Sequence, residues 1–286
     1  MITFRPSFLF RKVTVIGVGL IGGSLGMAMK QRKLAFEIVG VSQQSSSLTT
    51  ALKNNAIDKA SNDIKDAVSN ADLVILSTPV SIIASLLPRI GPYLKRNCII
   101  TDVGSTKAAI VSAAQKYLPP HAHFVGSHPL AGSEKRGAEF ASSGFFENSI
   151  CLMTPVEQTN KIACDRVKEL WTKVGASVKF LAPDDHDKAL AFISHLPHVV
   201  AYSLMGSIPD DSLGYAAQGL KDTTRIASSN PQMWIDICMA NKRNLVASID
   251  EFVKHLAAVR KAIIGDDQQS LTTLFKNAKT KRDALG

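Results

Sequence analysis

Residues 12–31 read KVTVIGVGLIGGSLGMAMKQ, and this stretch decides the expected fold. A short β-branched run leads into the glycine pattern Gly17, Gly19 and Gly22, and helix-forming residues follow. In such a strand-turn-helix unit the first glycine allows a tight turn, the second lets the backbone approach a pyrophosphate, and the third lets helix and strand pack closely. The helix N-terminus then faces the anion. The pattern predicts a dinucleotide-binding, Rossmann-like unit.

The pattern continues outward from this unit to about residue 183. Short β-branched runs alternate with helix-length segments, which is typical of βαβ units and a mostly parallel sheet. The expected strands cover residues 12–16, 37–41, 73–77, 98–102, 123–126, 149–154 and 178–181. The expected helices cover residues 22–31, 48–54, 80–93, 107–117 and 160–174.

The second half of the chain has a different character, because strand signals end after Pro183. Apolar residues at helical spacing cover residues 186–205, 231–261 and 268–281, and Asn230-Pro231 is a helix-start signal. The sequence therefore predicts an α/β dinucleotide-binding domain at 1–183 and an all-α domain at 184–286. So small a helical domain exposes more apolar surface than one copy buries, which favours a homodimer.

Composition excludes several classes of protein. The chain has 286 residues, of which 45% are hydrophobic and 20% charged, so it is globular and not disordered. The net charge of +9 is concentrated in residues 1–33 (+6) and 242–286 (+4), with −1 between them. Basic residues are not interleaved with aromatic ones as in a single-strand groove, so we expect no nucleic-acid partner. A net positive charge is equally expected of a protein that binds anionic small molecules.

The cysteines and the longest apolar run indicate where in the cell the protein is expected. The four cysteines are scattered without metal-ligand spacing, which favours a reducing cytosol and neither disulfides nor zinc. The longest apolar run, residues 13–29, is interrupted by glycines and is too irregular for a membrane span. The N-terminus lacks the apolar core and cleavage site of a signal peptide. We expect a cytoplasmic protein without a membrane partner.

The end of the second expected strand bears on the choice of cofactor. The acidic residue that would hold the ribose 2′-hydroxyl of NAD is missing, and Ser42, Gln43 and Gln44 stand there instead. Glu37 lies at the wrong end of the strand to replace it. The uncharged set favours NADP, although no arginine adjoins Ser42. The alternative is a pocket that accepts both NADP and NAD.

Polar loops after other strands hold candidate catalytic groups. Ser105 follows the strand at 98–102, where open α/β sheets bind ligands, although a serine there also suits a helix cap. His128 lies on the loop SHPLAGSEK, and a histidine so placed is available for proton transfer near neutral pH.

Further candidates lie in the helical half. His195 and His198 are three residues apart in SHLPH and reach one side of a helix; they lack a well-spaced acidic third ligand, so we expect no metal. Arg225 suits recognition of a carboxylate, and a surface pair with Asp222 is the alternative.

Taken together and in this order, these segments resemble the prephenate and arogenate dehydrogenases of tyrosine biosynthesis. The similarity lies in GVGLIGGS from Gly17, DVGSTK from Asp102, SHPLAGSEKRG from Ser127, HD at His186, SHLPH from Ser194 and GLKDTTRIASSNPQMW from Gly219. The resemblance implies a Rossmann-like domain, a helical dimerisation domain and an active site between them. It implies that a cyclohexadienol transfers a hydride to a nicotinamide while the ring carboxylate leaves as carbon dioxide.

The resemblance also implies roles for individual residues. His128 would accept the proton of the ring hydroxyl, and Ser105 would orient that hydroxyl. The expected substrate-binding residues are Arg225, His198, His195, Ser133, Glu134 and Trp234, the last also suiting ordinary helix packing. The expected cofactor-binding residues are Gly17, Gly19, Leu20, Ile21, Gly22, Ser42, Thr78, Pro79 and Asp102.

Some alternatives stay open at this point. The substrate is a dianionic or zwitterionic cyclohexadienol, and the sequence does not separate prephenate from arogenate. A β-hydroxyacid dehydrogenase, which relies on a lysine of its helical domain, and a non-catalytic NADP-sensing module are rival functions. With no mutase or regulatory segment visible, we expect a monofunctional enzyme in which any tyrosine feedback acts at the active site.

Overall fold

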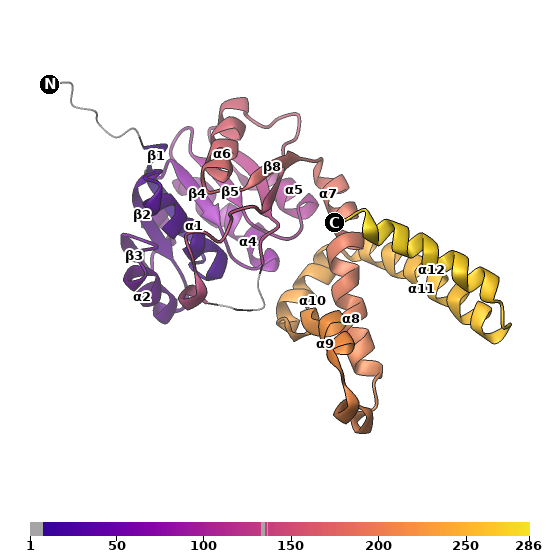
Figure 1. The fold of residues 1–286 in the computed structure, drawn as a ribbon. Coiled ribbons are helices and arrows are strands. Elements are labelled where there is room, and N and C mark those ends of the chain that lie inside the picture. Colours follow the sequence, from indigo (N-terminus) through magenta and orange to yellow (C-terminus); the bar gives the residue numbers. More distant parts are fainter. Residues whose placement is uncertain (1–7, 133–134, 136) are drawn as a thin grey trace.

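A computed structural model describes residues 8–132, 135 and 137–286 of the chain. The first half forms one eight-stranded sheet with helices on both faces (Figure 1). Its strands are β1 (Phe10–Ile16), β2 (Ala35–Val41), β3 (Lys59–Ser61), β4 (Leu73–Leu76), β5 (Ile99–Asp102), β6 (His123–Pro129), β7 (Ile150–Thr154) and β8 (Ser177–Phe180). Its helices are α1 (Leu20–Gln31), α2 (Ser45–Lys53), α3 (Ile64–Val68), α4 (Val80–Ile90), α5 (Ala108–Tyr117) and α6 (Lys161–Lys173).

The strand order confirms the expected Rossmann-like, mostly parallel sheet. The order is β3-β2-β1-β4-β5-β6-β7-β8, and the paired neighbours are parallel except for β6 and β7, which are antiparallel. The order reverses beside β1, and ligands of open α/β sheets bind at such a switch point. Gly17 and Ser77 follow β1 and β4 at this edge of the sheet.

Strand β1 shows why these residues form a central strand. Val13 and Val15 are fully buried in the core under α1 and α6, whereas Ile16 belongs to the core under α4 and α5. Successive side chains of a strand point to opposite faces, so a strand covered on both sides is a continuous apolar run. Residues 13–16 are accordingly all buried, and Thr14 is the one polar side chain among them.

The second half is helical, as expected. It contains α7 (Pro183–Leu190), a π-helical turn (Ala191–His195), α8 (Leu196–Ser207), α9 (Gln218–Thr224), α10 (Pro231–Ala240), α11 (Lys242–Ile264) and α12 (Gln268–Asp283). The apolar segment expected at 231–261 is divided at Asn241, whose φ of −113° and ψ of 29° are not helical. The domain boundary at residue 183 stays a prediction.

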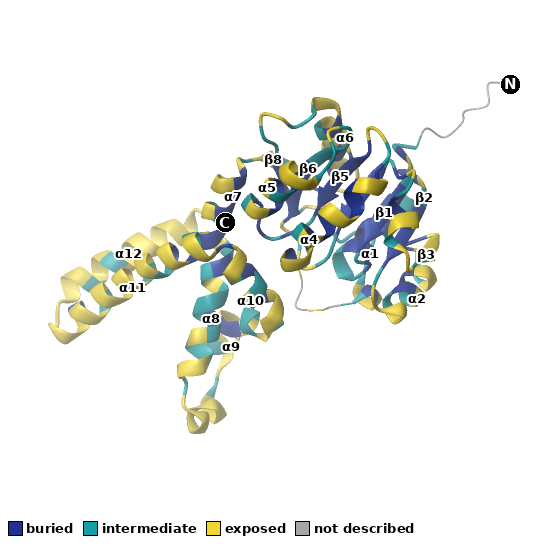
Figure 2. Cartoon of the chain, turned by 180° about the vertical axis from the view of Figure 1, so that it is seen from behind, coloured by how far each residue is buried: buried dark blue, intermediate teal, exposed yellow. Residues whose placement is uncertain are grey.

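Helices of the second half pack directly against the first half. Helix α7 packs against α5, and α10 packs against α4. Trp234 and Ile237 of α10 enter the core beneath α4, and Ser81 Oγ donates a hydrogen bond to Asp236 Oδ2 at 2.7 Å. Helices α11 and α12 run side by side away from the sheet (Figure 1) and are mostly exposed (Figure 2). Their exposed apolar side chains include Val246, Val253, Leu256, Ile263, Ile264 and Phe275.

One helical run of the described residues, Pro183–Ser207, is long and apolar enough to cross a membrane by length and composition. It contains the buried polar residues His186, Asp187 and His195. His186 and Asp187 are hydrogen-bonded to residues of the sheet-containing half. Buried, paired polar groups of this kind are typical of a helix inside a folded protein.

Candidate active site

The glycine loop after β1 has one open position and two crowded ones. Gly17 has a φ of +99°, and a Cβ atom there would lie 2.3 Å from the Ser77 carbonyl oxygen. A Cβ atom at Gly22 would lie 2.1 Å from the Gly17 carbonyl oxygen. A Cβ atom at Gly19 would meet no described atom within 4 Å. Gly17 and Gly22 thus shape the turn, and Gly19 leaves room at the start of α1.

The glycine loop and the N-terminus of α1 together form a cradle that fits a dinucleotide. No described side chain caps α1, so the backbone amides of its first turn, at Leu20 and Ile21, are available to an anion at the helix N-terminus. The Oγ1 atom of Thr78, directly after β4, is buried without a hydrogen-bond partner among the described residues. Unpaired buried hydroxyls are rare and indicate a missing partner. Pro79 follows Thr78 as the residue before α4.

Ser42, the residue expected near the ribose, directly follows β2. Ser42 Oγ accepts a hydrogen bond from Gln44 N at 3.2 Å, directly before α2. Glu37 lies opposite Lys12 in the sheet register and pairs with Lys59. The carboxylate of Glu37 is thus at the far end of the strand from Ser42.

Asp102, one of the expected cofactor contacts, has a side chain that is bonded within the protein. Its side chain is fully buried, Oδ1 accepts from Ser127 N at 3.1 Å, and Oδ2 accepts from Gly104 N at 2.9 Å and forms an ion pair with Lys107 Nζ. Lys107 Nζ also donates to the Ser127 carbonyl oxygen at 2.8 Å. Protein groups thus occupy both oxygens, and the Asp102 side chain ties β5 to β6; its role as a cofactor contact stays a prediction.

The catalytic candidate His128 is hydrogen-bonded to a residue of the helical half. Its Nδ1 atom lies 2.8 Å from His186 Nε2, and His186 Nδ1 lies 2.8 Å from Asp187 Oδ1. A carboxylate only accepts, so His186 Nδ1 carries the hydrogen, and in neutral His186 the Nε2 atom accepts from His128 Nδ1. The Nε2 atom of neutral His128 is thereby left with a lone pair.

Burial and hydrogen bonding shift the pKa values of His128 and Asp187, the two ends of the hydrogen-bonded row through His186. Burial lowers the pKa of His128 well below its ordinary value, and the charges of His186, Lys107 and His195 act in the same direction. Although burial opposes it, hydrogen bonds from His186 and from the backbone of Ala108 and Lys107 hold the pKa of Asp187 below its ordinary value. The site therefore pairs a neutral base with a buried carboxylate two residues behind it.

Ser105 lies half-buried on the loop between β5 and α5 and does not cap the helix. The cap comes from the other half: Asp187 Oδ1 accepts from Lys107 N at 2.7 Å, and Oδ2 accepts from Ala108 N at 3.0 Å. A carboxylate at a helix N-terminus satisfies unpaired amides and favours the helix dipole. The same side chain thus orients His186 and anchors the end of the Ser105 loop.

His195, His198 and Trp234 form an aromatic group on the helical side. The ring of His198 stacks on Trp234 with 3.5 Å between centroids, and His195 contacts Trp234 edge to face at 6.2 Å. His198 Nδ1 donates to the Ser194 carbonyl oxygen at 3.0 Å. The Nε1 atom of Trp234 and the Nε2 atom of His195 are buried with no partner in the described part of the chain.

Arg225 lies next to this group. Burial is the main cause that lowers the pKa of His198, and the positive charge of Arg225 adds to it, so the two side chains are close. Asp222, the alternative partner, accepts a hydrogen bond from Gln218 Nε2 at 2.6 Å. Ser133 and Glu134 lie outside the described residues.

The sequence pattern gave His186 and Asp187 no role beyond the resemblance, and it gave no signal for Asn241. The only available signal was the His-Asp pair shortly after Pro183.

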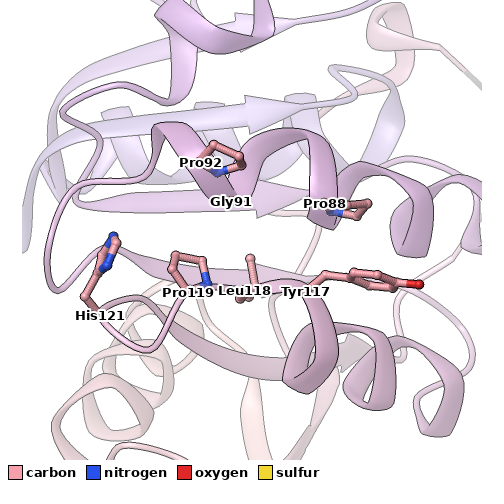
Figure 3. Close-up of a pocket in the computed structure, with 7 residues that line it drawn as sticks. All are labelled: Pro88, Gly91, Pro92, Tyr117, Leu118, Pro119 and His121. Atoms are coloured by element: carbon pink, nitrogen blue, oxygen red, sulfur yellow. The ribbon is translucent and has the colours of Figure 1, made fainter.

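The cavity in Figure 3, of about 290 Å³ near Pro88, Tyr117 and His121, is lined by the carboxyl ends of α4 and α5. Those ends lie away from the strand ends that hold the glycine loop, so the cavity is separate from this site.

Comparisons with known proteins agree with this arrangement. The model of the family "Prephenate dehydrogenase, nucleotide-binding domain" matches residues 25–180, and that of "Prephenate dehydrogenase, dimerization domain" matches residues 182–277. The prephenate dehydrogenase of Bacillus subtilis is 36% identical over 96% of this chain and 76% of its own length. The cyclohexadienyl dehydrogenase of Zymomonas mobilis is 33% identical over 97% of each chain.

A solved structure shows the same fold. The prephenate dehydrogenase of Aquifex aeolicus, in complex with hydroxyphenyl propionate and NAD+, superposes with a TM-score of 0.90 at 32% identity. The match covers 96% of this chain and 98% of that one.

Proposed function

The chain belongs to the prephenate dehydrogenase family, and from this premise we propose that it oxidises and decarboxylates a cyclohexadienol acid in tyrosine biosynthesis. The products would be 4-hydroxyphenylpyruvate from prephenate and tyrosine from arogenate. The observation that supports it is the hydrogen-bonded row of Asp187, His186 and His128, which ends in a buried neutral base beside the Ser105 loop. The family matches give no support to a β-hydroxyacid dehydrogenase or a nucleotide sensor.

His128 is proposed as the proton acceptor. The row presents the lone pair of Nε2, which takes the proton of the ring 4-hydroxyl while the carbinol carbon gives up a hydride. When bound, the nicotinamide ring supplies the hydride acceptor. The electrons of the bond between ring and carboxylate move into the ring, which becomes aromatic as carbon dioxide leaves, and the resulting phenolate oxygen takes the proton back from His128 to give the phenol. The carboxylate of Asp187 stabilises the positive charge that His128 gains, through His186.

The remaining residues bind and orient. The hydroxyl of Ser105 is proposed to hold the substrate hydroxyl toward His128. Arg225 supplies a guanidinium for a carboxylate, which a dianionic substrate requires. His198 and Trp234 form an aromatic wall beside it, and His195 lies next to them. Ser133 and Glu134 stay predictions for the pocket mouth.

The cofactor is a nicotinamide dinucleotide, and the proposed preference is NADP with NAD accepted. Ser42 at the end of β2 brings no negative charge against a 2′-phosphate, and Glu37 is held by Lys59 at the other end. A Ser42→Asp variant should lose NADP turnover by about tenfold or more and keep NAD turnover, because a carboxylate repels the phosphate and accepts from the ribose hydroxyl. Ser47→Asp, further along α2, is the matched control.

The assembly is proposed to be a homodimer in the cytoplasm. The matched dimerization model covers the helices that expose Val253, Leu256 and Phe275. An apolar surface of this kind is typical of an interface. Sedimentation at several concentrations tests it.

The test of function is formation of reduced nicotinamide in a grid of prephenate or arogenate with NAD or NADP. The expected result is turnover in at least one combination, reduced about 10²- to 10⁴-fold in a His128→Asn variant that still binds cofactor. A wild-type protein that binds cofactor but is silent in all four combinations would contradict the proposal.

A further inference from the structure

Asn241 lies in the break between α10 and α11 and is 3% exposed. Its Nδ2 atom donates to the Asp187 carbonyl oxygen at 2.7 Å and lies 3.1 Å from His195 Nδ1. Its Oδ1 atom accepts from Asn244 Nδ2 at 2.8 Å. Because a carbonyl oxygen only accepts, the Asp187 contact requires the NH₂ group on that side, and the same group faces His195.

This orientation decides where the proton of His195 lies. An NH₂ group donates, so Nδ1 of neutral His195 is the acceptor and Nε2 carries the hydrogen. Burial lowers the pKa of His195 to about 4, although the charge of Asp187 opposes it. The ring is therefore neutral near pH 7 and presents an N–H donor.

No described atom completes a hydrogen bond to this donor, and the backbone of Ser105 contributes only a partial one that raises the pKa of the ring. His195 is 1% exposed, and its buried Nε2 atom has no hydrogen-bond partner among the described residues. The backbone of Ser105 is close enough to raise its pKa, and the ring of Trp234 lies edge to face with it. The donor thus lies between the loop that holds the reacting hydroxyl and the aromatic wall of the substrate pocket.

We propose that Asn241 is a positioning residue, which holds His195 as an Nε2–H donor for an acceptor oxygen of a bound molecule. This rests on the proposed function, which brings two such oxygens to the site: a carboxylate of the cyclohexadienol and the carboxamide oxygen of nicotinamide. An unpaired buried donor is costly, so its retention is explained by a partner present only in the complex. Asn241 acts through His195 and touches neither ligand.

The first test is the tautomer, read by nitrogen NMR on the whole protein with labelled histidine. The His195 signals are assigned by their loss in His195→Gln. In the wild type we expect hydrogen on Nε2 and a bare Nδ1. In Asn241→Asp we expect hydrogen on Nδ1, because a carboxylate accepts where the amide donated. Asn277→Asp, the same change at an exposed site of α12, should leave the signals unchanged.

The second test is kinetic. Asn241→Asp and Asn241→Leu should raise KM for one ligand by about 10- to 100-fold, the effect of a lost hydrogen bond to a polar or charged group. A raised substrate KM assigns the donor to the carboxylate, and a raised cofactor KM assigns it to the carboxamide. Thermal unfolding of each variant shows whether it is folded.

Two results would overturn the proposal: hydrogen on Nδ1 in the wild type, or folded Asn241 variants with both KM values unchanged. Failure of the proposed function is separate, because the wild type would then turn over neither substrate while the NMR result stands by itself.

Discussion

Asp187 in the first helix of the helical half accepts a hydrogen bond from the backbone amide of Lys107 in the other half, at 2.7 Å. The same carboxylate orients His186, which contacts His128. One side chain thus connects the two halves, caps α5 and determines which nitrogen of the base is free. The tautomer of His128 therefore depends on residues of the helical half.

Replacing Asp187 with asparagine should separate these roles. The amide oxygen can still accept from Lys107 N, but the NH₂ group cannot accept from Ala108 N, so the loss in stability should be about 1–3 kcal/mol. His186 loses its carboxylate and the charge opposite His128, so kcat should fall about 100-fold or more. Steady-state kinetics and urea unfolding measure the two effects, with the exposed Asp185→Asn as control. Equal kcat in both variants would contradict the role of the row.

The glycine loop predicts two different outcomes for alanine. Gly19→Ala should leave the unfolding free energy within about 0.5 kcal/mol, because its Cβ meets open space, and should weaken dinucleotide binding about tenfold or more. Gly17→Ala should destabilise by about 2 kcal/mol or more, because its φ is +99° and the Ser77 carbonyl oxygen is in the way. Calorimetric binding and chemical unfolding check both. Tight binding by Gly19→Ala would place the pyrophosphate elsewhere.

Removing one partner of the buried Lys107–Asp102 pair should lower the stability more than neutralising both partners. Lys107→Met leaves a buried carboxylate without its partner and should cost about 3–5 kcal/mol of stability. Adding Asp102→Asn should recover a large part of the loss, whereas the exposed Lys116→Met should change little. A double-mutant cycle from urea unfolding gives the coupling, and additive effects would argue against the pair.

Acid should destabilise the folded protein through His195. Its pKa is lowered to about 4 in the folded state, against about 6.5 in the unfolded chain. The unfolded chain therefore binds the proton first as the pH falls, and stability is lost between about pH 6.5 and pH 4. The loss from this residue between pH 7 and pH 5 should be roughly 2 kcal/mol. His195→Gln should show a flatter dependence in urea unfolding, and an unchanged slope would exclude a buried neutral ring.

Local pattern was sufficient where structure depends on neighbours in the chain. Residues 12–31 predicted β1, the glycine turn and α1, because the turn geometry and the burial of the strand on both faces depend on residues that are adjacent in the chain. Strand β3 was missed because Lys59–Ser61 is three residues long and has no apolar run. The break at Asn241 was missed because apolar spacing continues through it, while its side chain binds Asp187 far away in sequence.

The sequence by itself determined a dinucleotide-binding half, a helical half and the candidate His128. The three-dimensional fold was needed to show that His186, 58 residues away, is hydrogen-bonded to His128, and that the Asp102 side chain pairs with Lys107. The physical reason is that a tautomer and a pKa depend on burial and on partners brought together through space, which no local spacing of residues records.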